Sequence, residues 1–327
     1  MIVTKHRFPF IIILLLILAG VSCKDNGDEV PEPEGVHLSI DGGSITPTSI
    51  RLVWTRSDSA IFKSYEVYFS RSHGFIPSAS TRYGATDQRD ETAKVVDNLM
   101  PSSRYYFKVR LVMRDDRVAD SNEETARTAD LPATESIVRF IHASSSLSTM
   151  IVKIDGATTD TLILFGNSPY RIFFAGAHGI SLYQDALKID SATIDFIGNF
   201  KASLFIIDKP TSTASRFSFR AERYTYAEPT LPDTALVRFV DASLSLGVAS
   251  LHIGSPGGQF VGSNVAFGRA SAYAHIAGGD YSVFVTQGDD TTMVRSSSAF
   301  TLSNDRRYTI AAIDSSAMAK LKSFVDD

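Results

Sequence analysis

The chain has 327 residues, of which 44% are hydrophobic and 21% are charged, and its formal net charge is −4. This length predicts two or three domains, and the apolar content is enough for folded cores and far from the profile of a disordered chain. Basic and acidic residues are interspersed without a basic stripe, which argues against nucleic acid as a partner.

The first residues have the layout of a secretory signal. A basic patch at residues 5–7 precedes an apolar run at residues 8–19 and small residues before Cys23. The run is about a dozen residues long and therefore shorter than the roughly 20 residues that span a bilayer as a helix. We predict that residues 1–22 are a signal peptide, and no later apolar run is long enough to suggest a membrane segment.

Cys23 is the only cysteine, and Ser22 precedes it. A small residue immediately before a cysteine resembles the lipobox of bacterial lipoproteins. In that family the cysteine is lipidated and becomes the mature N-terminus, so the resemblance implies a lipid anchor at Cys23. An ordinary signal peptide with a chance cysteine is the alternative. If Cys23 is acylated, no thiol is left for a disulfide, and the domains must be held by their cores alone.

Residues 23–34 are predicted to be the lipidated cysteine and an acidic, proline-spaced linker. Lys24-Asp25 followed by Asp28-Glu29 resembles the charged signal that sends Bacteroidota-type lipoproteins to the outer face of the outer membrane. The resemblance implies an exported protein that is lipid-anchored to the outer membrane and faces outside the cell. Charged and proline-rich linkers extend, so this linker would hold the first domain off the membrane.

Residues 35–130 show the pattern of strands with one buried face. The alternation at residues 50–54 places Trp54 in the core phase rather than on the surface as a sugar-stacking platform. Residues 99–105 have the spacing L-x-P-x-x-x-Y. This spacing, with Trp54 upstream, resembles a fibronectin type III domain. The resemblance implies that Tyr105 is a tyrosine corner, whose hydroxyl bonds to upstream backbone.

The second half of the chain contains two copies of one sequence pattern. Val138–Ser144 (VRFIHAS) recurs as Val237–Ser243 (VRFVDAS), and later F-G, A-G and I-D pairs recur at a spacing near a hundred residues. This spacing predicts two domains of one type, at residues 135–228 and 234–327. The pattern resembles the bacterial domain of unknown function 4397, whose members are predicted immunoglobulin-like sandwiches, often in tandem on exported proteins. The resemblance implies architecture and location but no mechanism.

These patterns predict an all-β fold, with three consecutive immunoglobulin-like or fibronectin-like β-sandwich domains after a lipoprotein signal peptide. No window has helix periodicity over more than two turns. We expect a closing strand at residues 216–226 in the first repeat and, by the same register, at residues 320–325 in the second.

The sequence contains no motif of a catalytic, cofactor or metal site. G-x-S-x-G, H-E-x-x-H and G-x-G-x-x-G are absent, so we predict no enzyme, no cofactor and no metal. His142 could act as a base presented by a loop, but Asp241 occupies the matching place, and an edge or turn residue is the better interpretation of both. Residues 155–160 could offer oxygens to calcium but lack the ligand density of a calcium loop. An Asp-Gly hairpin turn is the better interpretation there.

Three aromatic residues of the first repeat, Tyr170, Phe173 and Phe174, form a candidate binding surface for a glycan or a protein. Adjacent strand residues point to opposite faces, so one of the two phenylalanines could be exposed or buried between domains. The second repeat has His275 and Ile276 at this place. Interdomain packing is the better interpretation of these residues, and a binding surface is the alternative.

We therefore expect a cell-surface-anchored, non-catalytic binding or adhesion lipoprotein. Its predicted partners are the membrane, through the N-terminal lipid, and a glycan or an envelope protein. A structural spacer or assembly component of an envelope complex is the alternative. A third alternative is an undetected hydrolase, which requires a cleft with converging acid and base groups.

Overall fold

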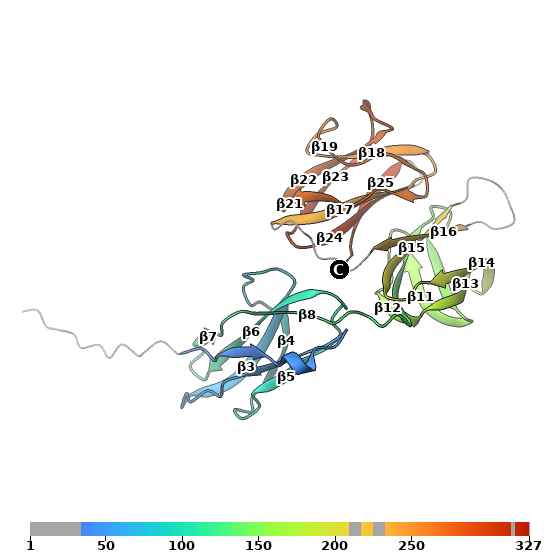
Figure 1. Cartoon of the computed structure of the whole chain (residues 1–327). Coiled ribbons are helices and arrows are strands. Elements are labelled where there is room, and N and C mark those ends of the chain that lie inside the picture. Colours follow the sequence, from blue (N-terminus) through green and yellow to red (C-terminus); the bar gives the residue numbers. More distant parts are fainter. Residues whose placement is uncertain (1–33, 209–216, 225–232, 315–317, 327) are drawn as a thin grey trace, which may run out of the picture. The chain divides into compact units, whose positions relative to one another are not determined.

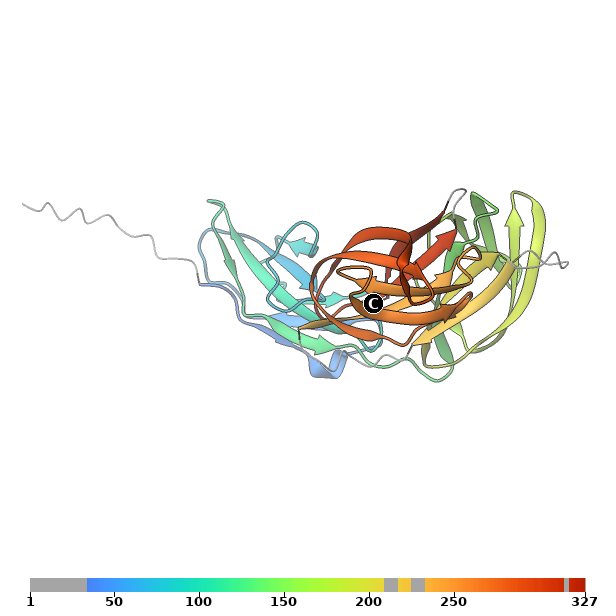
Figure 2. The same cartoon turned by 90° about the horizontal axis from the view of Figure 1, so that it is seen from above.

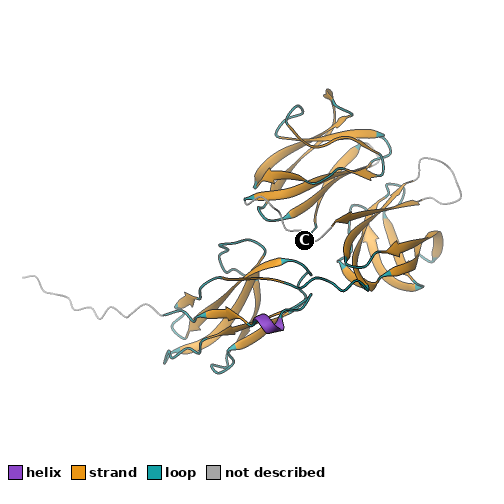
Figure 3. Cartoon of the chain, viewed as in Figure 1, coloured by secondary structure: helices purple, strands orange, loops and turns teal. Residues whose placement is uncertain are grey.

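The computed structural model describes residues 34–208, 217–224, 233–314 and 318–326 (Figure 1). Cys23, the predicted signal peptide and nearly all of the predicted linker lie outside the described residues. The strands form layered sheets, seen from two directions in Figures 1 and 2. Figure 3 shows that strands make up almost all of the regular structure, and the helical element η1 (Gly42–Ser44) is a single 3-10 turn. No helix among the described residues has the length and apolar character needed to cross a membrane.

The first domain packs two sheets around one core. Its strands are β1 (Leu38–Ile40), β2 (Ile50–Trp54), β3 (Phe62–Ser70), β4 (Arg82–Thr86), β5 (Ala93–Val96), β6 (Arg104–Met113), β7 (Val118–Asp120) and β8 (Glu124–Arg127). One sheet has the order β1-β2-β5, and the other has the order β4-β3-β6-β7 with β8 also paired to β6. In β2 the side chains of Ile50, Leu52 and Trp54 are buried while that of Arg51 is exposed. The strand therefore has the one buried face that its alternation predicted.

The first repeat consists of two four-stranded sheets. Its strands are β9 (Glu135–Ala143), β10 (Thr149–Ile154), β11 (Ala157–Ile163), β12 (Arg171–Phe174), β13 (Gly176–Gln184), β14 (Leu187–Phe196), β15 (Phe200–Asp208) and β16 (Phe217–Tyr224). The sheet orders are β11-β10-β13-β14 and β12-β9-β15-β16. β9 and β15 are parallel, while their other neighbours are antiparallel. β16 lies where a closing strand was expected.

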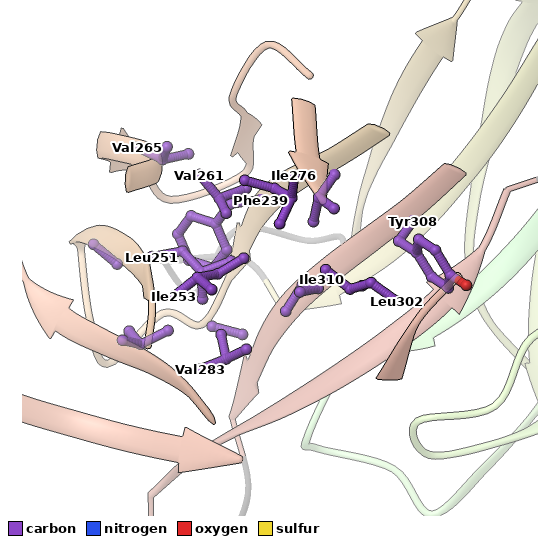
Figure 4. Packing of buried hydrophobic residues seen from close by; sticks show 14 of the residues in the cluster. Phe239, Leu251, Ile253, Val261, Val265, Ile276, Val283, Leu302, Tyr308 and Ile310 are labelled. Atoms are coloured by element: carbon purple, nitrogen blue, oxygen red, sulfur yellow. The ribbon is translucent and has the colours of Figure 1, made fainter. Parts of the chain in front are cut away.

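The second repeat has the same order of strands except for one additional short strand, β20. Its elements are β17 (Thr234–Ala242), β18 (Val248–Ile253), β19 (Gln259–Ala266), β20 (Arg269–Ala270), β21 (Ala274–Ala277), β22 (Gly279–Gln287), β23 (Asp290–Leu302), β24 (Arg307–Asp314) and β25 (Ala319–Val325). The sheets are β19-β18-β22-β23 and β20-β17-β24-β25, with β21 also on β17 and with β17 parallel to β24. Phe239 of β17 packs in the core with Leu251 and Val261 (Figure 4). The all-β class with immunoglobulin-like sandwiches is thus confirmed.

The paired parallel strands of each repeat are buried on both faces. In β15, Leu204 and Ile206 belong to the core of the first repeat, whereas Phe205 and Ile207 belong to a different cluster. Strands buried on both faces carry near-continuous apolar runs instead of alternation. The second cluster joins both repeats, and we call it the inter-repeat cluster. Its buried members are Ile141, Ala143, Phe205, Ile207, Val240, Ala242, Ala311, Ile313 and Phe324.

Candidate functional site

The structure does not bring the three predicted aromatic residues together as one exposed surface. Phe174 is 75% exposed. Phe173 is half-buried against the core of the first repeat and packs on Phe196, with 5.4 Å between the ring centroids. Tyr170 is also half-buried, and its hydroxyl lies 3.2 Å from Ser203 Oγ. Of the three side chains, that of Phe174 is open to solvent.

Tyr170 belongs to a buried polar network around Asp326. Arg139 on β9 lies over the Tyr170 ring, with 4.6 Å from Cζ to the centroid, and its Nη2 donates to Asp326 Oδ1 at 2.6 Å. Nζ of the buried Lys201 lies 4.2 Å from the same ring centroid and donates to the backbone carbonyl of Asp326. Two cationic side chains of the first repeat thus lie over the Tyr170 ring and donate to the residue that follows β25.

The second repeat completes the network. Asp326 is fully buried, and its Oδ2 accepts from Tyr273 Oη at 2.8 Å and from Thr309 Oγ1 at 2.6 Å. Burial and the neighbouring Asp326 carboxylate raise the pKa of Tyr273 well above its ordinary value, so its hydroxyl remains a donor. A buried charge is tolerated when it is paired and hydrogen-bonded. Both repeats therefore supply hydrogen-bond partners for this buried side chain.

The arginine of the V-R-F motif has the same role in both repeats. Nε of Arg139 donates to Ser203 Oγ at 2.9 Å, and Nε of Arg238 donates to Thr309 Oγ1 at 2.8 Å. Each bond joins the opening strand to its parallel neighbour. Arg238 also lies over the Tyr273 ring, with 5.0 Å from Cζ to the centroid. The motif was recognised from sequence, but the role of its arginine was missed. The sequence signal for this role is the position of the arginine, a charged residue inside an apolar run that does not alternate.

His142 and Asp241 also occupy matching places, and both are fully buried. Burial lowers the pKa of His142 to about 4 and raises the pKa of Asp241 to about 7. His142 Nδ1 accepts from the Ser144 amide at 3.4 Å, and Asp241 Oδ1 accepts from the Ser243 amide at 3.0 Å. The interpretation of both as edge or turn residues is wrong, because they lie on β9 and β17, each flanked by strands on both sides. Their burial also removes them as exposed bases.

The repeated I-D pair holds the loop that follows the opening strand of each repeat. The Asp208 carboxylate accepts from the Ser144 hydroxyl and from the Ser145 amide at 2.9 Å. In the second repeat, the Asp314 carboxylate accepts from the Ser243 hydroxyl and from the amide two residues later at 3.1 Å. These contacts give the matching serines and aspartates a structural role.

Residues 155–160 form a hairpin instead of a calcium loop. Asp155 and Gly156 have φ values of 49° and 85° and connect β10 to β11, as a two-residue turn with positive φ requires. Asp155 Oδ2 lies 2.7 Å from His178 Nδ1, and Asp160 Oδ1 accepts from Arg171 Nη2 at 3.0 Å. The carboxylates are thus paired with basic side chains. Within the described ranges, no group of three or more His, Cys, Asp or Glu side chains could hold a metal ion.

Two predicted structural residues lie in the core of the first domain. Trp54 is 3% exposed and packs edge-on against Tyr65, with 5.5 Å between ring centroids. Tyr105 is buried on β6, and its hydroxyl accepts from the Met100 amide at 2.8 Å. This bond to upstream backbone is the contact that the fibronectin type III resemblance implied for Tyr105.

Comparison with solved structures finds fibronectin type III domains among the similar proteins. The domain of human contactin 1 is 17% identical, with a TM-score of 0.24 over 30% of this chain and 77% of that chain. A domain of human fibronectin type III domain containing protein 3 is 20% identical, with a TM-score of 0.24 over 30% and 88%. A Yersinia enterocolitica family 28 exopolygalacturonase is 15% identical, with a TM-score of 0.23, and this chain covers 22% of its length. All three TM-scores are below 0.5, and no activity is transferred from these structures.

No curated protein matches the chain. Family models cover two separate stretches, one in the first domain and one in the second repeat. Residues 31–126 match the fibronectin type III domain, and residues 255–327 match a domain of unknown function, DUF4397.

Proposed function

We propose that this chain is a lipid-anchored, non-catalytic binding or adhesion protein of the bacterial cell surface. The observation that carries the proposal is the fibronectin type III domain at residues 31–126, which is a binding or scaffold-type module. The proposal also includes a second DUF4397 domain in the first repeat. It is supported by the shared V-R-F motif and by the matching strand order of the two repeats, apart from the additional short strand β20 in the second.

The proposed localisation at the membrane depends on Cys23. The cysteine follows a short apolar run and a small residue, and two or three acyl chains on it would hold the protein firmly, since each buried CH₂ contributes about 0.8 kcal/mol. Replacement Cys23→Ala is expected to move the protein from the membrane fraction to the soluble fraction. Ser22→Ala is the matched control, because it keeps both the cysteine and a small residue before it. Retention of Cys23→Ala in the membrane would contradict the anchor.

The absence of catalysis is part of the proposal. It is supported by the burial of His142 and Asp241 and by the pairing of Asp155 with His178. Among the described residues, these are the groups that the sequence offered as acid, base or ligand. None of them is presented to solvent with a free acid–base partner, as a hydrolase would need.

Binding is tested with residues 34–327, which contain all the described cores. Glycan arrays and pull-downs should identify a ligand for this fragment. Phe174→Ala then tests the aromatic surface, because Phe174 is the exposed member of the predicted set. Phe260→Ala is a matched control, since Phe260 is an exposed phenylalanine on the second repeat. Equal loss of binding in both variants would contradict a surface centred on Phe174.

A structural spacer is the second candidate function. The inter-repeat cluster and the Asp326 network favour it, because buried contacts between consecutive domains would stiffen the chain. The same pull-down separates the two functions. Capture of envelope proteins alone, with no glycan bound on the arrays, would favour a spacer or assembly component.

A further inference from the structure

The two repeats meet through matching sheet faces. On the first repeat, Ile141 and Phe205 point away from the repeat's own core, and on the second repeat Val240 and Phe324 do the same. The rings of Phe205 and Phe324 are 6.1 Å apart at their centroids, in an edge-on arrangement. Aromatic pairs prefer this arrangement over direct face-to-face stacking. The outer face of each sheet is therefore apolar at its centre.

Charged side chains also connect the two repeats beside this apolar contact. Arg139 Nη1 donates to the Val325 carbonyl at 2.6 Å, and Nη2 donates to Asp326 Oδ1 at the same distance. The Arg139 and Asp326 side chains are 4% and 0% exposed. A guanidinium can address two acceptors at once in a fixed geometry. Arg139 thus binds both a backbone carbonyl and a side-chain carboxylate at the end of β25.

We propose that the outer face of the first repeat is an interaction surface, and that its partner is a second sandwich of the same type with an acidic residue at the end of its last strand. In this chain the partner is the second repeat, and the two repeats behave as one cooperative unit. The proposal goes beyond surface anchoring and ligand binding, and it holds whichever ligand the protein binds.

Apolar and charged groups make different contributions to the pairing of the two repeats. The apolar centre supplies contact area without direction, because burial of apolar surface is non-directional. A shifted pairing would remove the acceptors on Asp326 from Arg139 and Lys201, and removing one partner from a buried charge pair is strongly destabilising. The charged groups therefore select one register of the two sheets.

Hydrogen exchange of the full chain tests this coupling. Asp326→Ala is expected to speed amide exchange in β15 of the first repeat as well as in β24 of the second, although the substituted residue belongs to the second. A double-mutant cycle with Arg139→Met should show that the two substitutions are coupled by at least tenfold in the opening equilibrium, about 1.4 kcal/mol. Faster exchange in β24 alone would overturn the proposal. So would a double variant whose change in the opening equilibrium is the product of the changes in the two single variants.

The control is Asp155→Asn, which removes the charge from the 2.7 Å contact with His178 inside the first repeat. It should leave exchange in β24 unchanged. If Arg139→Met does not fold, Arg139→Lys replaces it in the cycle, because lysine keeps the positive charge but lacks the fork that addresses the Val325 carbonyl and Asp326 Oδ1 together. Additive effects with Arg139→Lys would count equally against the coupling.

Discussion

At the scale of single residues, His142 and Asp241 show how one backbone position can hold two different side chains. The position requires an acceptor for the amide two residues later, and both Nδ1 of His142 and Oδ1 of Asp241 provide one. In each case the second polar atom, Nε2 or Oδ2, is buried without a hydrogen-bond partner among the described residues. The neutral form of each residue is therefore favoured, and the two repeats should respond to pH in opposite directions.

Replacing either residue by asparagine should expose this opposition. The pKa of His142 is lowered from 6.5 to about 4, so the unfolded state binds the proton first and stability falls as pH falls through this window. The pKa of Asp241 is raised from 3.8 to about 7, so its contribution is present at low pH and is lost as pH rises through that window. Each effect can reach about 3–4 kcal/mol. Relative to wild type, His142→Asn should lose stability with rising pH, and Asp241→Asn should gain it.

Urea titrations at several pH values between about 4 and 7.5 measure these slopes. Asparagine keeps a side-chain acceptor at each position, so the turn that follows should be preserved. Wild-type protein should show a shallower dependence than either variant, because the two contributions nearly cancel over the shared window. Parallel curves for wild type and both variants would show that neither group stays neutral in the folded state.

Trp54 provides a second test at this scale. Trp54→Ala removes a large side chain from the core of the first domain and should lower the free energy of unfolding by about 3–5 kcal/mol. Trp54→Phe is the milder comparison, because it keeps a ring and removes an indole N–H that is buried without a partner. Far-UV circular dichroism in urea measures both variants. A loss under about 1 kcal/mol for Trp54→Ala would contradict its role in the core.

At the scale of elements, the hydroxyl of Tyr105 helps to hold the turn before β6. The Tyr105 hydroxyl accepts from the Met100 amide at 2.8 Å. Tyr105→Phe leaves that amide without its partner and should lower the free energy of unfolding by about 1–3 kcal/mol. Tyr83→Phe is the control, since the Tyr83 hydroxyl bonds to the Asp97 carboxylate at an exposed site. Chemical denaturation should rank Tyr105→Phe as clearly the more damaging change.

For strands with one buried face, the sequence pattern predicted both the strand and the side chains that are buried. For strands with two buried faces, it predicted the strand but not what covers the second face. β2 alternates buried and exposed side chains, which placed Trp54 correctly. β15 and β24 have no alternation, because their second faces lie in the inter-repeat cluster. Their apolar runs predict strands but do not name the surface that covers the second face. The Arg139–Asp326 pair joins residues 187 positions apart, and local spacing carries no signal for such a contact.

At the scale of the whole molecule, the buried residues fall into separate cores. Two clusters draw their members from residues 36–126, and the three clusters that contain repeat residues have no member in the first domain. Cooperative unfolding needs shared buried contacts. The first domain is therefore expected to unfold on its own, while the two repeats share the inter-repeat cluster.

The single tryptophan makes this separation measurable. Trp54 lies in the first domain, so tryptophan fluorescence reports unfolding there alone, whereas far-UV circular dichroism reports strands in all parts of the chain. The two signals should give different urea midpoints, because coincident transitions are expected only for a single cooperative unit. Asp326→Ala should shift the transition seen by circular dichroism and leave the fluorescence midpoint in place. Tyr105→Phe should do the reverse, since its hydroxyl bond lies within the first domain. A fluorescence midpoint that moves with Asp326→Ala would mean that the first domain and the repeats unfold as one unit.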